Sequence, residues 1–148
     1  MKNLLRYSVL SFLIISVIGM TGCENDKNQS EEFLLLTSHI WNFDTLYHTS
    51  TDPEVLEYHE TIMEGMTDGN ATMNYFTDGT WKFIIDDWVE NGTWVLSEDG
   101  TKLTSYEGDD DPGLTYSISE LTSDVLVLIE TVIDPDYPTF DITVRWVK

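Results

Sequence analysis

From residue 38 onward, short stretches in which apolar and polar residues alternate are separated by turn-forming sequences. Within residues 80–86, Trp81, Phe83 and Ile85 fall on one side of the alternation and Lys82 on the other. Successive side chains of a strand point to opposite faces, so this pattern predicts antiparallel strands with one buried face. Eight strands are expected, at residues 40–48, 71–77, 80–86, 92–97, 102–107, 114–119, 125–132 and 139–147.

Three dipeptides lie between these strand-like stretches: Asp78-Gly79, Asn91-Gly92 and Asp99-Gly100. Asp-Gly and Asn-Gly favour the positive φ angles that tight hairpin turns require. Successive hairpins build a meander, and antiparallel strands lose their exposed edges when they close into a barrel. The sequence therefore predicts an all-β fold, an eight-stranded antiparallel up-and-down β-barrel.

Two segments carry helical rather than strand signals. A short helix is expected at residues 31–36, capped by the serine that precedes it. A longer one is expected at residues 53–64, inside the first strand–strand connection, because Asp52 can cap it and Pro53 suits its first position. Gly65 is the expected stop. An extended conformation through residues 57–63 is the alternative for this segment.

The N-terminus has the order of a secretory signal. Lys2 and Arg6 precede an apolar stretch at residues 7–20, and small residues follow. Residues 20–23, Met-Thr-Gly-Cys, resemble the lipobox of bacterial lipoproteins, although Met20 replaces the usual leucine. Residues 1–22 are thus expected to be a lipoprotein signal peptide, 23–30 a flexible polar tether and 31–148 the barrel domain.

The lipobox resemblance implies that Cys23, the one cysteine of the chain, carries acyl chains such as palmitate. Two or three chains make a stable anchor, so the expected partner is a lipid bilayer. The expected location is the cell envelope, at the outer membrane, with the leaflet left open. An ordinary signal peptide followed by an incidental cysteine is the alternative.

The net charge of the chain limits the kinds of partner that it can bind. The chain has 27 acidic and 7 basic residues, a formal net charge of −20. Such a chain repels polyanions, so nucleic-acid binding is excluded. The length fits one domain with one core. A monomer without a cofactor is expected.

The order of four segments resembles the lipocalin-like domains of Bacteroidetes lipoproteins. These are residues 35–43, 75–81, 92–104 and 116–128. The family usually has glycine two residues before the first tryptophan, where this chain has His39. The resemblance implies an up-and-down barrel whose interior is able to hold a small apolar molecule.

Large apolar side chains are the candidates for such an interior. The expected barrel lining is Trp41, Phe43, Phe76, Trp81, Phe83, Trp94, Tyr116, Leu126, Leu128 and Phe140. These side chains either surround a pocket or fill the barrel, and the sequence leaves both open. A barrel with no cavity above one drug-sized volume, roughly 300 Å³, would contradict the binding of a small molecule inside it.

If the resemblance holds, the 49–70 connection crosses the barrel mouth. The helix in it would then be a lid, presenting Leu56, His59, Met63 and Met66. The carboxylates Asp109, Asp110 and Asp111 could bind calcium, but they lack the spacing of a calcium loop, so a solvated turn is favoured and no metal site is expected.

The leading hypothesis is a membrane-anchored lipocalin-like protein that binds a small apolar or amphipathic molecule in its barrel. The alternative is a protein- or glycan-interaction module that uses the barrel as a scaffold, with exposed aromatics such as Tyr106 or Tyr137. No Gly-x-Ser-x-Gly, His-Glu-x-x-His or phosphate-binding glycine loop occurs, so no catalytic residues and no enzymatic activity are expected.

Overall fold

The computed structural model describes residues 29–108, 110–135 and 137–148. The predicted signal peptide, Cys23 and most of the predicted tether lie outside these residues, as does Asp109. Among the described residues, no helix is both long enough and apolar enough to cross a membrane.

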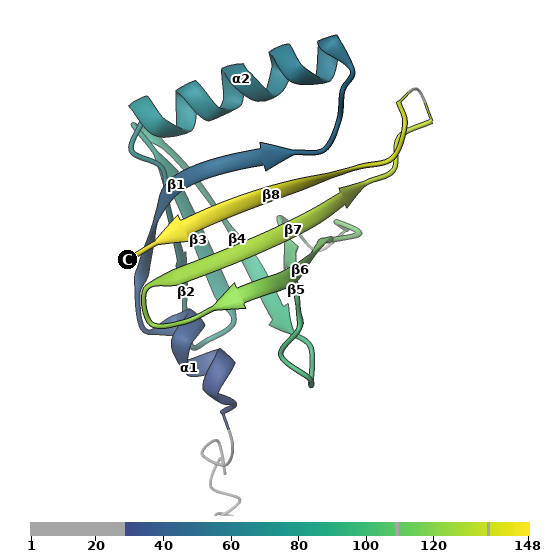
Figure 1. The fold of residues 1–148 in the computed structure, drawn as a ribbon. Coiled ribbons are helices and arrows are strands. Elements are labelled where there is room, and N and C mark those ends of the chain that lie inside the picture. The colour runs from purple at the N-terminus through teal and green to yellow at the C-terminus, as the bar shows by residue number, and fades with distance from the viewer. Residues whose placement is uncertain (1–28, 109, 136) are drawn as a thin grey trace, which may run out of the picture.

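Eight antiparallel strands follow one another around a closed barrel in sequence order, and the last pairs with the first (Figure 1). The predicted fold class is confirmed. The strands are β1 (Ile40–His48), β2 (Thr72–Tyr75), β3 (Thr80–Ile85), β4 (Trp88–Leu96), β5 (Lys102–Tyr106), β6 (Leu114–Leu121), β7 (Val125–Val132) and β8 (Phe140–Val147).

One predicted turn is wrong. Asn91 and Gly92 lie inside β4, paired with Lys82 and Trp81 of β3. The turn between these strands is made by the two residues before Trp88, and the first of them, Asp86, adopts a φ of 48°. The other two predicted turns each have glycine at positive φ, 84° at Gly79 and 69° at Gly100.

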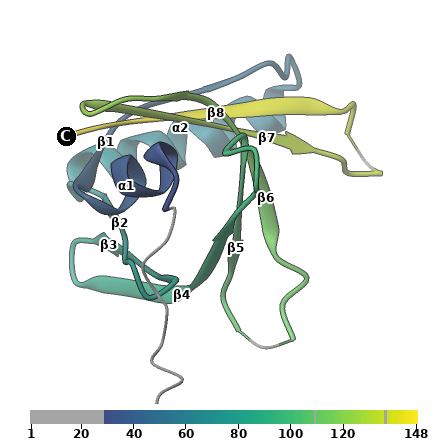
Figure 2. The same ribbon diagram turned by 90° about the horizontal axis from the view of Figure 1, so that it is seen from below.

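Two helices lie at opposite ends of the barrel (Figures 1 and 2). α1 (Glu31–Thr37) is capped by Ser30, whose side chain accepts a hydrogen bond from the Phe33 amide. α2 (Pro53–Asp68) is capped by Asp52, which accepts from two backbone amides of the first turn. The predicted stop at Gly65 is wrong, because the helix continues to Asp68 and Gly69 caps it.

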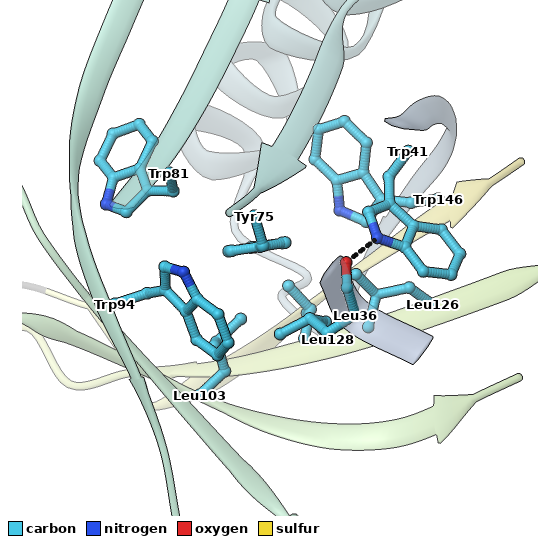
Figure 3. Close-up of a cluster of buried hydrophobic side chains, with 9 residues drawn as sticks. All are labelled: Leu36, Trp41, Tyr75, Trp81, Trp94, Leu103, Leu126, Leu128 and Trp146. Carbon is cyan, nitrogen blue, oxygen red and sulfur yellow. Dashed lines mark hydrogen bonds between the residues drawn. The ribbon is translucent and has the colours of Figure 1, made fainter. Parts of the chain in front are cut away.

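The core fills the half of the barrel next to α1. Trp41 is fully buried and its indole donates a 3.0 Å hydrogen bond to the Leu36 carbonyl, which fastens α1 to β1. The His39 ring, where the resemblance leads one to expect glycine, packs edge-on against Trp41 at 5.7 Å. The cluster of buried side chains in Figure 3 is Leu36, Trp41, Tyr75, Trp81, Trp94, Leu103, Leu126, Leu128 and Trp146.

Candidate functional site

The barrel contains a cavity of about 170 Å³ in the half away from α1. Side chains from every strand except β1 contribute to it, together with the loop between β5 and β6. Its volume is below the roughly 300 Å³ set above for a small-molecule pocket, so only a ligand smaller than a drug fits inside. The lining is Met73, Tyr75, Trp81, Phe83, Glu90, Ser105, Glu107, Asp111, Leu114, Tyr116, Leu128, Val144 and Trp146.

Aromatic rings form the deep walls of this cavity, and their neighbours hold them in place. The Trp81 indole donates a hydrogen bond of 3.3 Å to the Tyr106 carbonyl. Phe83 and Phe43 each pack edge-on against Trp146, with ring centroids 6.4 and 5.8 Å away. Rings held in this way offer a preformed apolar surface to a ligand.

Two tyrosine hydroxyls belong to the same cavity. Tyr75 is 1% exposed and Tyr116 is half-buried, and both line the space. Within the described residues neither side chain makes a hydrogen bond. Burial, then the neighbouring Tyr116, raises the pKa of Tyr75 well above its usual value. Both hydroxyls therefore stay protonated at neutral pH and can donate to or accept from a ligand.

Carboxylates gather at the open end. Glu90 of β4, Glu107 after β5 and Asp111 of the β5–β6 loop belong to the lining. Asp111 accepts hydrogen bonds from the backbone amides of Glu107 and Gly113, which lower the pKa of its carboxyl. Burial raises the pKa of the Tyr116 hydroxyl, and the charges of Glu130 and Glu107 raise it further, so these carboxylates lie near it.

Of the ten predicted lining residues, Trp81, Phe83, Tyr116 and Leu128 line the cavity. The others lie elsewhere. Trp41, Trp94 and Leu126 are buried in the filled half of the barrel, with Phe43 half-buried against that core, and Phe140 is buried where α2 covers β8.

Phe76 was wrongly placed inside the barrel. It follows the last residue of β2 and is 39% exposed, because β2 ends at Tyr75 and Tyr75 takes the inward position. Val144 and Trp146 were missed as lining residues, although they alternate with Asp141, Thr143 and Arg145 in the sequence and share the face of Phe140. No alternation of this kind indicated that Glu90, Glu107 and Asp111 line the cavity.

The predicted lid does not cover this cavity. α2 lies along the far ends of β1 and β8, and none of Leu56, His59, Met63 and Met66 lines the cavity. Met66 packs against the core, and His59 is buried beside His48 and Phe140. The C-cap of α2 at Gly69 accepts a hydrogen bond from the Asp86 amide at the β3–β4 turn, and the polar end of the cavity is lined by Glu90 of β4 and by the β5–β6 loop.

The described residues contain no group of three metal-ligating side chains. Both carboxylate oxygens of Asp111 accept backbone amides, and Asp110 is exposed in the same loop. Asp111 therefore organises the rim of the cavity through hydrogen bonds to the chain itself.

No protein-family model matches the chain, and neither does any curated protein. Solved structures with a similar fold include a DUF4847 family protein from Bacteroides vulgatus, with a TM-score of 0.44 and 14% identity over 74% of this chain and 93% of that one. Bovine odorant-binding protein in complex with its natural ligand gives a TM-score of 0.46 and 18% identity, over 84% of this chain and 77% of that one.

Proposed function

We propose that this chain is a membrane-anchored binding protein for a small amphipathic molecule whose apolar part is about the size of one ring. The observation that carries the proposal is the open, aromatic-walled cavity with unpaired tyrosine hydroxyls inside it. Apolar walls with a few polar groups are the usual construction of small-molecule sites.

The volume sets the size of the ligand. An apolar cavity of about 150 Å³ is large enough to take up benzene, and this one measures about 170 Å³. A single ring or a chain of similar volume fits inside. A polar group attached to it would reach the carboxylate-lined opening, and a bulkier apolar group would have to remain outside.

Binding is tested by calorimetric titration with benzyl alcohol, a neutral molecule with one ring and one hydroxyl. We expect saturable binding of one molecule per chain, with a negative heat-capacity change because apolar surface is buried. Absence of saturable binding by both benzyl alcohol and toluene would contradict the proposal.

Membrane anchoring through Cys23 is supported by the sequence of residues 1–23. The first described residues lead into α1, at the end of the barrel away from the β5–β6 loop (Figure 1), and that loop contributes Glu107 and Asp111 to the cavity lining. An anchor attached on that side leaves the opening free for a ligand. At the outer membrane, such a protein would collect small molecules close to the bilayer.

Anchoring is tested by expressing the full chain in a bacterial host supplied with an alkyne analogue of palmitate. We expect label on the wild-type protein in the membrane fraction, and loss of label for Cys23→Ser. Equal labelling of Cys23→Ser, or an unlabelled wild-type protein that is soluble, would contradict the anchor.

The two aromatic residues named for the interaction-module alternative are only partly exposed. Tyr106 and Tyr137 are half-buried, and the Tyr137 hydroxyl donates to Glu54 of α2 at 3.2 Å. The exposed neighbours Trp88 and Val89 lie at the start of β4, beside the cavity opening. Trp88 shares the face of β4 with Glu90 and extends the candidate binding site, whereas Val89 lies on the outer face.

A further inference from the structure

The opening of the cavity carries carboxylates from separate parts of the chain. Glu90, Glu107 and Asp111 line it, and Glu130 of β7 lies near the Tyr116 hydroxyl. Burial raises the pKa of the Glu130 carboxyl, which shows that this group lies partly away from water. A positive charge placed among these groups would be attracted by all of them.

No lysine, arginine or histidine of the described residues lines the cavity to balance this charge. Arg145 points to the outer face of β8 and pairs there with Asp44. Lys82 and Lys102 alternate with the inward-facing Trp81 and Leu103, so both lie on the outer face. The cavity opening is therefore electronegative and has no internal counter-ion.

Tyr75 is a second, independent feature that points to a ligand. It is 1% exposed, lines the cavity and makes no hydrogen bond among the described residues. Because this side chain lines the cavity, a ligand bound there could supply a hydrogen-bond partner to its hydroxyl. Figure 3 shows the Tyr75 ring in the middle of the barrel, between Trp81 and Trp94 on one side and Trp146 on the other.

We propose that the cavity selects small amphipathic cations, with a ring-sized apolar body among the aromatic walls and an ammonium group between the tyrosine hydroxyls and the carboxylates at the opening. This inference rests on the proposed binding function and specifies its ligand class. An ammonium donates hydrogen bonds, which the phenolic and carboxylate oxygens accept. It is also attracted by aromatic faces. Trp88, 64% exposed and on the same face of β4 as Glu90, adds such a ring at the rim.

An anion of the same size would be repelled at the cavity opening. Its carboxylate would approach Glu90, Glu107 and Asp111 with no cation to offset the repulsion. Like charges juxtaposed in this way suppress binding, whereas a neutral molecule keeps only the apolar contacts. The expected order of affinity is cation, then neutral molecule, then anion.

The test is a calorimetric comparison of benzylamine, benzyl alcohol and benzoate, which share one ring and differ in charge. At low salt we expect benzylamine to bind at least about tenfold more tightly than benzyl alcohol, and benzoate to bind most weakly. Salt should reduce the preference for the amine, because a charge at an open site is screened.

Glu107→Gln removes one charge of the opening without changing the shape of the side chain, and Glu98→Gln is its matched control, in the exposed turn at the α1 end. We expect Glu107→Gln to lower the ratio of amine to alcohol affinity and Glu98→Gln to leave it unchanged. Equal effects of the two variants would overturn the inference, because the preference would then come from the net charge.

The outcomes separate this inference from the function on which it rests. If benzyl alcohol binds and benzylamine binds no better, the cation preference is wrong and the binding function stands. If benzoate binds most tightly, the cation preference is likewise overturned. If neither these three compounds nor toluene binds, both proposals are contradicted; if toluene alone binds, only the cation preference is wrong.

Discussion

Gly92 explains how a single residue shapes a wall of the cavity. A Cβ at this position would lie 1.9 Å from the Tyr106 carbonyl oxygen and 2.8 Å from the Trp81 indole nitrogen. The Trp81 indole and the Tyr106 carbonyl form a hydrogen bond in that space. The glycine is therefore required for close approach of β3, β4 and β5, and not for a turn.

Replacement of Gly92 by alanine should destabilise the protein by roughly 2 kcal/mol, because the added methyl group has no room in the packed barrel. The free energy of unfolding in urea measures this change. Gly65→Ala is the matched control, since nothing lies within 4 Å of a Cβ there. Alanine is the better helix former, so this variant should be more stable by about 0.5–1 kcal/mol. A Gly92→Ala variant as stable as wild type would contradict the close approach.

At the scale of elements, signals carried by neighbouring residues predicted the structure well. Asp52 caps α2 and Pro53 begins it, as the sequence indicated. The predictions were wrong where packing between strands, and not the local sequence, decides the structure. Asn91-Gly92 has the sequence of a hairpin turn, yet contact with Trp81 and Tyr106 places it inside a strand. Local turn preference is weaker than the packing of three strands.

The packing of α2 on the barrel depends on a pair of histidines that no local pattern identified. The His48 and His59 rings lie 4.8 Å apart, and the Nδ1 atom of each is buried without a hydrogen-bond partner among the described residues. His59 also contacts the rings of Phe140 and Tyr58. Desolvation, then the neighbouring His48, lowers the pKa of His59 from its usual 6.5.

This lowered pKa gives the stability of the protein a defined dependence on pH. Below pH 6.5 the unfolded chain binds a proton at residue 59 that the folded protein resists, so folding loses stability as the pH falls through this range. Glu60 lines the same surface pocket, and its carboxylate would oppose the effect. His59→Leu should remove this contribution.

The measurement is thermal unfolding at pH 7.5 and pH 5.5 for the wild-type protein and for His59→Leu. Acid also relieves repulsion among the many carboxylates, so the comparison between the two proteins is the decisive quantity. We expect the wild type to lose more stability, or gain less, than the variant. An identical change in both would contradict this account, because it would show that His59 takes up a proton as readily in the folded protein as in the unfolded chain.

At the scale of the whole molecule, the barrel has a filled half beside α1 and an open half with a cavity. The sequence predicted the closed barrel, because alternation and turns are local and eight strands close only in a few ways. It could not decide between a filled barrel and a pocket. The volume of a cavity is the small difference between the interior volume of the barrel and the summed volume of the side chains inside it. Nor could the sequence predict that Glu90 and Glu107 meet at one opening, since they belong to different strands.

The central claim is that a small molecule binds inside the barrel, and one pair of variants tests it most directly. Val144→Phe adds volume to a residue that lines the cavity, while Val95→Phe makes the same change at an exposed site on the outer face of β4. With both variants folded, as judged by circular dichroism, we predict that benzyl alcohol binds Val144→Phe at least about tenfold more weakly than wild type, because the ring occupies the space of the ligand. Val95→Phe should bind as wild type does. Unchanged affinity in Val144→Phe would show that the ligand binds elsewhere and would contradict the account.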